Sequence, residues 1–423
     1  MSLFSGFYKK TREERIAITA ESRQLSTQSK DILLTDQNIP EAIAGNMAEN
    51  HLGTFALPFS LVPQLVIDTV EYSIPMVTEE PSVVAACSLG AKIIAKAGGF
   101  TSHISERLMI GQVALYDVPD MGEAQATILA QHDKLLAQAN KAHPSIVKRG
   151  GGARQLTVEQ KEDFLIAYLH VDVQEAMGAN ILNNMLEAIK DELAELTQGK
   201  ALMAILSNYA TESLVTANCR IPIQQLHVEP QVALKTAQNI AKASQLAQVD
   251  PYRAATHNKG IFNGIDALVL ATGNDWRAIE AGAHAYASRD GSYRGLSTWE
   301  IDQQDLVGQL TLPLPIATVG GSIGLNPKVQ AAFDILGQPK ARTLATITAA
   351  VGLCQNFAAL RALVTAGIQQ GHMKLHAKSL AMLAGALEHE IDQVALLLHQ
   401  APHTNLETAQ SILASIRQET EKP

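Results

Sequence analysis

The sequence predicts an α+β protein in which a large helix-rich domain is interrupted by a smaller domain with its own sheet. The 423 residues are 47% hydrophobic and 18% charged, a composition typical of a globular protein with a sizeable core. An uncharged stretch over 343–360 indicates one central apolar helix. Segments between 107 and 212 follow the order β-α-β-β-α-β, which favours a ferredoxin-like unit.

Charge and cysteine content restrict the partners and the compartment. Lys+Arg number 33 against 42 Asp+Glu, and the net charge of -9 argues against a nucleic-acid partner. The cysteines Cys87, Cys219 and Cys354 lie far apart in apolar runs, which indicates buried thiols in a reducing compartment. The first 16 residues contain no apolar core of signal-peptide length. We therefore expect a cytoplasmic protein.

The uncharged stretch over 343–360 approaches the length of a membrane span. Threonine, glutamine and asparagine side chains interrupt it, however, and these are poorly tolerated in a lipid-facing helix. A buried core helix is the better interpretation, so we expect no membrane contact.

Local signals define the other elements in chain order. An apolar run over 81–96, opened by Pro81 and closed by Gly98-Gly99, predicts a helix. In the inserted domain, the expected segments begin at Ile110 (strand), Glu123 (helix), Gln155 and Asp163 (strands), Asn180 (helix) and Leu202 (strand). The expected domains are 1–106 with 213–370 (large, substrate-binding), 107–212 (small, inserted, nucleotide-binding) and 371–423 (a C-terminal helical flap).

Two adjacent carboxylates, Glu79 and Glu80, precede the helix predicted over 81–96. Acidic residues at a helix start most often simply complement the helix dipole. The functional alternative makes Glu80, beside the apolar VVAA run, a general acid.

A lysine and an aspartate stand beside glycines further along. Lys259 lies between Asn258 and Gly260, and Asp275 follows sixteen residues later. We interpret both as loop residues joined by one apolar strand-like run. A loop lysine is usually a solvated charge, but this pair also fits an ammonium that stabilises an oxyanion and the carboxylate that tunes it.

His372 and His376 have the spacing of a metal-binding pair on a helix. No third ligand of suitable type lies nearby, so no metal is expected. A histidine at a flexible glycine, ahead of a mobile tail, better suits a proton donor near neutral pH.

The usual phosphate-binding motifs, GxGxxG after a strand and the Walker lysine, are missing. Three glycine-containing segments remain as candidates, although each also fits an ordinary loop. They are KRGGGAR over 148–154, DVQEAMGAN over 172–180 and Gly320-Gly321-Ser322.

Seven stretches, taken together and in order, resemble the 3-hydroxy-3-methylglutaryl-CoA reductase family, in particular its soluble bacterial class (class II). They are ENHLGTFALP, TEEPSVVAA, EAMGAN, ILSN, DPYRAATHNKG, GNDWRA and QQGHMKLHA. The resemblance implies reduction of the thioester to mevalonate and free coenzyme A with two NAD(P)H, the mevalonate step of isoprenoid synthesis.

By motif match, the resemblance implies four catalytic residues. Lys259 would polarise the thioester carbonyl, and Glu80 would give a proton to the developing alcohol. Asp275 would hold both groups in the required charge states. His372 would protonate the departing thiolate.

The resemblance also implies binding residues and an assembly. The hydroxymethylglutaryl part would contact Ser82, Asn208, Arg253 and Asn263. The dinucleotide would contact Lys141, His143, Lys148, Arg149, Asp172, Val173, Gln174, Ala176, Met177, Gly178 and Asn180. No acidic residue lies in 140–144, where relatives that use NADH tend to carry one, so NADPH is expected to be preferred, with NADH possible. A homodimer with shared active sites is implied as well.

Two departures from the family pattern concern cofactor contacts: Glu175 stands for the usual aspartate, and Ser322 follows the glycines without the common threonine. Two other functions stay open, a coenzyme A ester hydrolase or lyase without a redox cofactor and a catalytically silent helical scaffold. The scaffold is disfavoured because Glu80, Lys259, Asp275 and His372 occur together.

Overall fold

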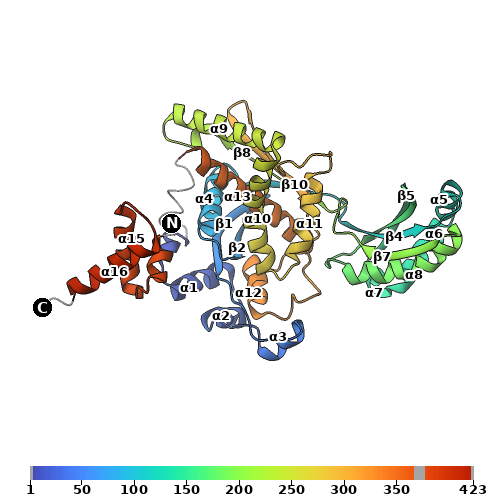
Figure 1. The fold of residues 1–423 in the computed structure, drawn as a ribbon, viewed down its shortest axis with the longest axis horizontal. Helices are drawn as coiled ribbons and strands as arrows, with labels where there is room; N and C mark the ends of the chain where they lie inside the picture. Colours follow the sequence, from blue (N-terminus) through green and yellow to red (C-terminus); the bar gives the residue numbers. More distant parts are fainter. Residues whose placement is uncertain (1–2, 366–376, 421–423) are drawn as a thin grey trace.

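The computed structural model describes residues 3–365 and 377–420, which form two sheets and the helices around them (Figure 1). The larger sheet has the order β2-β1-β3-β8-β10-β9. Its pairs are antiparallel except β1 with β3, which run parallel. The strands are β1 (Phe59–Ile67), β2 (Val70–Val77), β3 (Phe100–Ile104), β8 (Leu214–Pro222), β9 (Ser297–Asp302) and β10 (Asp305–Pro313).

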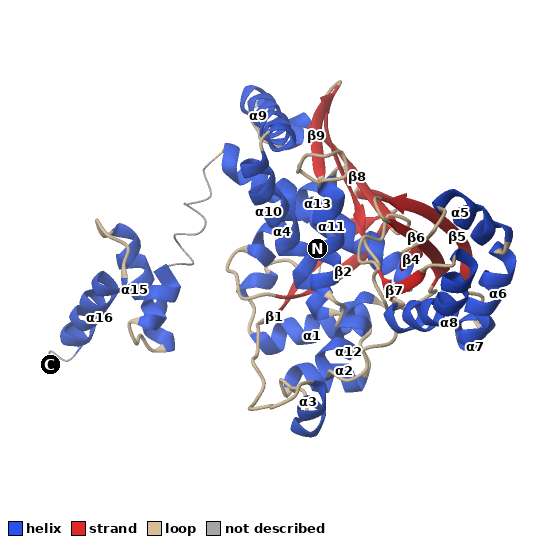
Figure 2. Ribbon diagram, turned by 45° about the vertical axis from the view of Figure 1, so that its right-hand side comes forward, coloured by secondary structure: helices blue, strands red, loops and turns tan. Residues whose placement is uncertain are grey.

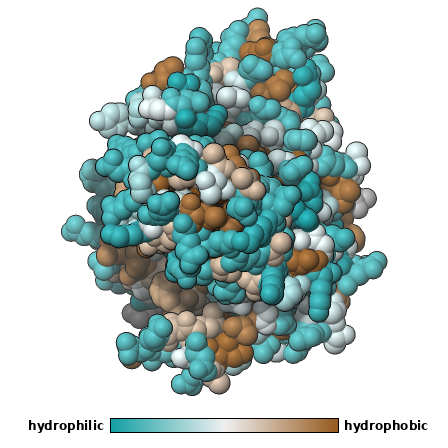
Figure 3. Space-filling model, turned by 90° about the vertical axis from the view of Figure 1, so that its right-hand side faces the viewer, coloured by the Kyte–Doolittle hydropathy of each residue, from teal (hydrophilic) through white to brown (hydrophobic). Residues whose placement is uncertain are grey.

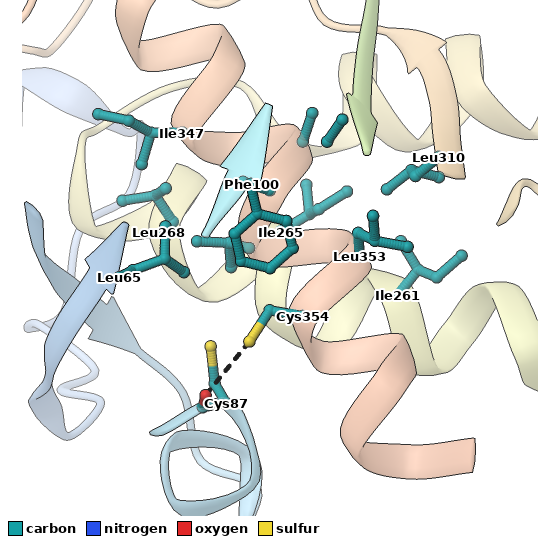
Figure 4. Packing of buried hydrophobic residues seen from close by; sticks show 14 of the residues in the cluster. Leu65, Cys87, Phe100, Ile261, Ile265, Leu268, Leu310, Ile347, Leu353 and Cys354 are labelled. Carbon is teal, nitrogen blue, oxygen red and sulfur yellow. Dashed lines mark hydrogen bonds between the residues drawn. The ribbon is translucent and has the colours of Figure 1, made fainter. Parts of the chain in front are cut away.

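The expected central apolar helix is confirmed as α13 (Ala341–Val364), which packs on helices α4 (Val83–Lys96) and α10 (Pro251–Ala271) and on β8. Within the described part of the chain it is the one helix long and apolar enough to span a membrane, but 72% of its most apolar window is buried. It lies in the core of the large domain: Figure 4 shows Ile347 and Leu353 beside Ile265 and Leu268 of α10.

Two of the cysteines face each other where α4 and α13 pack. The Cys354 thiol donates a hydrogen bond to the Cys87 carbonyl oxygen at 3.3 Å (Figure 4). Burial raises the pKa of Cys354 well above its usual value. All three cysteines are buried free thiols, as expected from the sequence.

The remaining helices of the large domain cover its sheet and core. They are η1 (Phe7–Lys9), α1 (Arg12–Arg23), α2 (Thr27–Leu34), α3 (Glu41–Met47), η2 (Ile223–Gln225), α9 (Pro230–Val249), α11 (Trp276–Ala287) and α12 (Pro327–Leu336). The helix predicted to begin at Pro81 instead begins at Val83, because Ser82 adopts a left-handed conformation (φ 74°) that a helix cannot include.

The smaller sheet confirms the ferredoxin-like prediction. Strands β4 (Leu108–Tyr116), β5 (Gly152–Lys161), β6 (Phe164–Asp172) and β7 (Lys200–Leu206) pair in the order β5-β6-β4-β7. All pairs are antiparallel. Alternating side chains of β6 are buried, as a sheet with one covered face requires.

Helices cover one face of this sheet (Figure 2). The single helix expected from Glu123 is three, α5 (Met121–Ala130), α6 (His132–Ala142) and α7 (Pro144–Lys148), because the chain leaves helical geometry at Gln131 and His143. The other helix, α8 (Ala179–Thr197), buries seven residues against the sheet. The outer side of this domain is mainly hydrophilic with scattered hydrophobic residues (Figure 3).

Two chain segments connect the sheets, between β3 and β4 and between β7 and β8. Ser105 N–H donates to the Leu214 carbonyl at 3.0 Å, and Leu108 N–H donates to the Glu212 carbonyl at 3.2 Å. Between them lies Arg107, 6% exposed. Its guanidinium donates to the carbonyl oxygens of Gln174 and Ile316, so one buried cation joins the two domains.

The C-terminal residues form a hydrophobic cluster of their own. Helices α15 (Glu388–Gln400) and α16 (Leu406–Thr420) pack on each other. Arg417 donates two hydrogen bonds, at 2.8 and 2.9 Å, to the Glu390 carboxylate. His372 and His376, with the glycine that precedes His372, lie outside the described residues.

Candidate active site

The structure brings together three of the sequence-predicted residues, Glu80, Lys259 and Asn263. Glu80 lies in the loop after β2, and the other two lie one turn apart on α10, which packs on β2. The Lys259 ammonium contacts the Glu80 carboxylate, and the Asn263 amide donates to its other oxygen at 3.2 Å. Lys259 is 59% exposed and Glu80 33% exposed, so a substrate can reach both.

The prediction that Lys259 lies in a loop is wrong. α10 runs unbroken from Pro251 to Ala271, so the apolar run after Lys259 is helix, not strand. Asp250 caps the helix by accepting two backbone N–H bonds, and Gly264 allows close approach to α13. Tertiary packing therefore overrides the local glycine and asparagine signals.

Two residues before Lys259, a buried polar network anchors the helix. His257 Nε2 lies 2.7 Å from the Ser297 hydroxyl, which donates to Asn356 Oδ1 at 2.8 Å. The Trp299 indole donates to the same oxygen at 2.8 Å. Burial lowers the pKa of His257 to about 3, so the imidazole is neutral. Sequence reasoning missed this network, whose only signal is polar residues inside an apolar helix.

Asn258 completes the anchor. Its amide donates to the Arg294 carbonyl at 2.9 Å and accepts from the Leu296 N–H at 2.8 Å, and its side chain is fully buried. His257 and Asn258, the two residues before Lys259, anchor α10 in the core. Lys259 is therefore held at a defined place on a rigid helix.

Two predicted substrate residues have polar groups without a protein partner. The Ser82 hydroxyl is buried and makes no hydrogen bond within the described part of the chain. The half-buried guanidinium of Arg253, in the first turn of α10, forms no hydrogen bond or ion pair there either. Desolvation lowers the pKa of Arg253. A buried polar group left unpaired is costly unless a ligand completes it.

Asp275 makes no hydrogen bond or ion pair with these groups in the described part of the chain. It is the N-cap of α11, where it accepts from the Ala278 N–H at 3.1 Å, and it lies 3.8 Å from Arg277. Its role toward Lys259 stays a prediction. The exposed Asn208 follows β7, and its carbonyl lies against Gly282 of α11, where a side chain would not fit.

The predicted dinucleotide segment joins the end of β6 to α8. Gly178, with φ 95°, is the N-cap of α8, and no side chain caps the helix. Val173 fills the space that a Cβ at Gly178 would need. The first turn of α8 therefore presents free N–H groups, which suit an anion. Gln174, Ala176 and Met177 lie in the loop before it, and Asn180 in its first turn.

The glycine triplet packs against this loop. A Cβ on Gly151 would lie 2.5 Å from the Asp172 carbonyl oxygen, so only glycine allows the approach. Lys148 and Arg149, at the end of α7, are exposed. Lys141 and His143 lie at the end of α6. The structure thus brings the basic turn, formed by Lys148 and Arg149, and the 172–180 loop together.

Glu175, the departure from the family pattern, connects the two domains. Its carboxylate accepts from the Thr318 hydroxyl and from the Ala341 N–H, both at 2.7 Å, and so caps α13. Asn274, next to Asp275, holds the same segment by accepting from the Ala317 N–H at 2.7 Å. The described residues contain no cluster of three or more potential metal ligands.

The ferredoxin-like sheet, the uncapped start of α8 and the ammonium–carboxylate pair fit an oxidoreductase. The sequence model for hydroxymethylglutaryl-coenzyme A reductase matches residues 11–377. The chain belongs to this family.

Individual relatives agree over nearly the full length. The 3-hydroxy-3-methylglutaryl-coenzyme A reductase of Archaeoglobus fulgidus is 41% identical over 421 residues, 98% of this chain and 95% of the relative. The probable reductase of Borreliella burgdorferi is 33% identical and covers 99% of this chain and 98% of the relative.

Solved structures are similar too. The Streptococcus pneumoniae reductase is 57% identical with a TM-score of 0.85, over 98% of this chain and 99% of that one. A class II reductase structure from the same organism, described as bound to NADPH in open conformations, is also 57% identical with a TM-score of 0.85, over 86% of this chain and all of that one.

Proposed function

We propose that this protein reduces 3-hydroxy-3-methylglutaryl-CoA to mevalonate and coenzyme A with NADPH, in the mevalonate pathway. The observation that carries the proposal is the contact of Lys259, Glu80 and Asn263 at an accessible position, joined to family membership over most of the chain. Two NADPH molecules, bound one after the other, would each supply one hydride.

The chain's own residues provide charge stabilisation and protons. The Lys259 ammonium would donate to the carbonyl oxygen as that oxygen becomes negative. Glu80, which accepts from both Lys259 and Asn263, would pass a proton to the same oxygen once its carboxyl group is protonated. Asp275 would tune these groups, and His372 would protonate the thiolate.

The free carboxylate of the substrate would pair with Arg253, because a guanidinium binds a carboxylate with two parallel hydrogen bonds. Ser82 has a buried hydroxyl available for the same ligand. Asn208 and Asn263 would complete the hydroxymethylglutaryl site.

The 172–180 loop and the basic turn fit the coenzyme. Uncapped N–H groups of α8 suit the pyrophosphate, while Lys148 and Arg149 suit a 2'-phosphate. NADPH is therefore favoured over NADH. Asp172, held by Arg154 at 3.2 Å, orients the start of the loop.

We further infer a soluble cytoplasmic homodimer that shares its active sites. A twofold arrangement would place the small domain of each subunit beside the large domain of the other, so the dimer would contain two complete active sites. Sedimentation of the active protein tests this, and a fully active monomer would contradict it.

The decisive assay measures the absorbance of reduced nicotinamide after purified protein is mixed with NADPH and the thioester. We expect oxidation that depends on the thioester, and a loss of about a hundredfold or more in Lys259→Ala. Lys242→Ala, an exposed lysine on α9, is the matched control. Coenzyme A released without NADPH oxidation would instead indicate a hydrolase or lyase.

A further inference from the structure

The loop that connects β6 to α8 contains two residues in a left-handed backbone conformation. Gly178 adopts it at little cost, but Gln174, with φ 53°, is a residue type that rarely does. The Gln174 N–H donates to Asp172 Oδ1 at 3.0 Å, and the Gln174 side-chain amide donates to Asp172 Oδ2 at 2.7 Å. Both bonds lie within the loop, so they do not fix where the loop lies on the large domain.

Arg107 fixes that position from the connection between β3 and β4. Its Nη1 atom donates to the Gln174 carbonyl oxygen, and its Nη2 atom donates to the Ile316 carbonyl oxygen and, at 3.4 Å, to that of Ala176. Gln174 and Ala176 belong to the loop, whereas Ile316 follows β10 of the larger sheet. One planar guanidinium therefore binds the loop and the large domain at the same time.

An arginine is a costly residue at this buried position. Arg107 is 6% exposed, and its Nε atom has no hydrogen-bond partner among the described residues. Its three acceptors are carbonyl oxygens, and Glu175 and Asp172 act on its charge only through space. Burying a charge without an ionised hydrogen-bond partner costs free energy that an apolar side chain of similar size would not. Stability alone therefore does not explain this arginine, whereas a need for donors in a fixed geometry does.

The short segment after β10 to which Arg107 binds is itself held in place. Ala317 exchanges two hydrogen bonds with the side chain of Asn274, at 2.7 and 3.0 Å. The Thr318 N–H donates to the Glu175 carbonyl oxygen at 2.9 Å, and the Thr318 hydroxyl donates to the Glu175 carboxylate at 2.7 Å. The bonds to Asn274 do not involve Arg107, so the segment stays on the large domain when Arg107 is changed.

We propose that Arg107 is a positioning residue for the coenzyme, which holds the 172–180 loop on the large domain in the arrangement that binds the dinucleotide. The inference rests on the proposed function, in which this loop and the start of α8 bind the part that NADPH and NADH share. Without the fork of donors, the loop occupies the binding arrangement for only a fraction of the time, and the apparent affinity falls by that fraction.

Arg107→Lys is the test variant, because an ammonium keeps the charge but has no planar fork to reach carbonyl oxygens on both sides. Dissociation constants for NADPH and NADH are measured by titration of nicotinamide fluorescence. We expect both constants to rise about tenfold and by the same factor. The KM for the thioester should stay nearly unchanged. Arg220→Lys, a change at an exposed arginine paired with Asp302 and Asp305, should alter none of these values.

Two results of the titrations would overturn the inference. A lower melting temperature with unchanged dissociation constants would show that Arg107 only stabilises the fold. A rise for NADPH alone would show that Arg107 acts on the 2'-phosphate, the role proposed for Lys148 and Arg149, and not on the loop. Arg107→Met, which leaves no charge buried, is the second variant should Arg107→Lys not fold.

Hydrogen exchange tests the same inference without coenzyme. The Ala176 amide donates to the Val173 carbonyl oxygen at 3.1 Å, and the Thr318 amide donates to the Glu175 carbonyl oxygen, so both amides report on the loop and its contact. We expect both to exchange faster in Arg107→Lys than in the unmodified protein. Unchanged exchange at both amides would overturn the inference.

The two measurements separate this inference from the function on which it rests. An unmodified protein that binds neither NADPH nor NADH would refute the proposed function. The exchange of the Ala176 and Thr318 amides would still decide whether Arg107 holds the loop.

Discussion

Lys259 illustrates how one residue is prepared for chemistry rather than for stability. Its ion pair with Glu80 is largely exposed, and pairs of that kind contribute little to folding. The buried contacts of His257 and Asn258 beside it do the structural work by fixing the helix. An ammonium on a fixed helix needs little reorganisation when charge develops on a substrate oxygen.

The buried His257 predicts sensitivity to acid. Its pKa lies near 3 in the fold against 6.5 for a free imidazole, so the unfolded chain binds a proton that the folded protein excludes. Stability should fall as pH decreases from 6.5 toward 3, by up to about 1.4 kcal/mol per pH unit. We expect His257→Gln to flatten this dependence in melting experiments, whereas exposed His403→Gln should not. An unchanged slope in His257→Gln would show that the histidine is not the group responsible.

At the residue scale, the sequence indicated the chemical groups better than their contacts. Glu80 and Lys259 were expected in one site and meet there. Asn263 was expected at the substrate but also bonds Glu80, and neither residue's neighbours indicate that. The bond joins residues 183 positions apart, which no local pattern encodes.

At the scale of elements, the β-α-β-β-α-β order was predictable because alternating and helical periodicities differ clearly in that domain. α10 was not, because Asn258, Gly260 and Gly264 are local signals for a loop. In the fold, Gly264 meets α13 and Asn258 bonds buried backbone groups, so both serve the helix. These contacts form only once the helices have packed, so the local sequence does not reveal them.

The loop before α8 depends on Glu175, and this predicts a coenzyme-specific effect. Its carboxylate caps α13 and holds the Thr318 hydroxyl, so Glu175→Ala removes these two side-chain bonds and loosens the loop on the large domain, while the backbone bond from Thr318 N–H to the Glu175 carbonyl remains. We expect a loss of stability of about 1 kcal/mol, typical of a lost cap, and a KM for NADPH that rises more than the KM for the thioester. Glu195→Ala, an exposed change on α8, is the control. Equal changes in both KM values would contradict a role in the coenzyme site.

The basic turn after α7 predicts the choice of coenzyme. Lys148→Glu would place a negative charge beside the ribose of the dinucleotide, where it repels a 2'-phosphate and accepts from a hydroxyl. We expect kcat/KM to fall for NADPH and to change much less for NADH. Lys161→Glu, at the opposite end of β5, should alter neither. An unmodified protein that already favours NADH would contradict the predicted preference.

At the scale of the whole molecule, the two domains are joined by single buried residues. Arg107 bonds carbonyls 67 and 209 positions away, one in each domain, and burial lowers the pKa of its guanidinium to about 10 while leaving it charged at neutral pH. The order of the segments indicated an inserted domain, but contacts over such separations lie beyond any periodicity. The limits of the domains at 106/107 and 212/213 stay predictions.

The C-terminal segment provides the last prediction, because α15 and α16 have their own hydrophobic cluster and so can be removed without opening the large domain. Deleting the chain from Lys374 onward should leave NADPH binding, measured by fluorescence titration, nearly unchanged and should depress turnover of the thioester. His372→Gln removes the proposed proton donor but keeps the rest of the flap, so it distinguishes protonation of the thiolate from closure of the flap. Because free mevaldehyde has no sulfur to expel, the variant should reduce it far better than it reduces the thioester. If both substrates slowed equally, His372 would not be the group that protonates the thiolate, and the tail would act through closure alone.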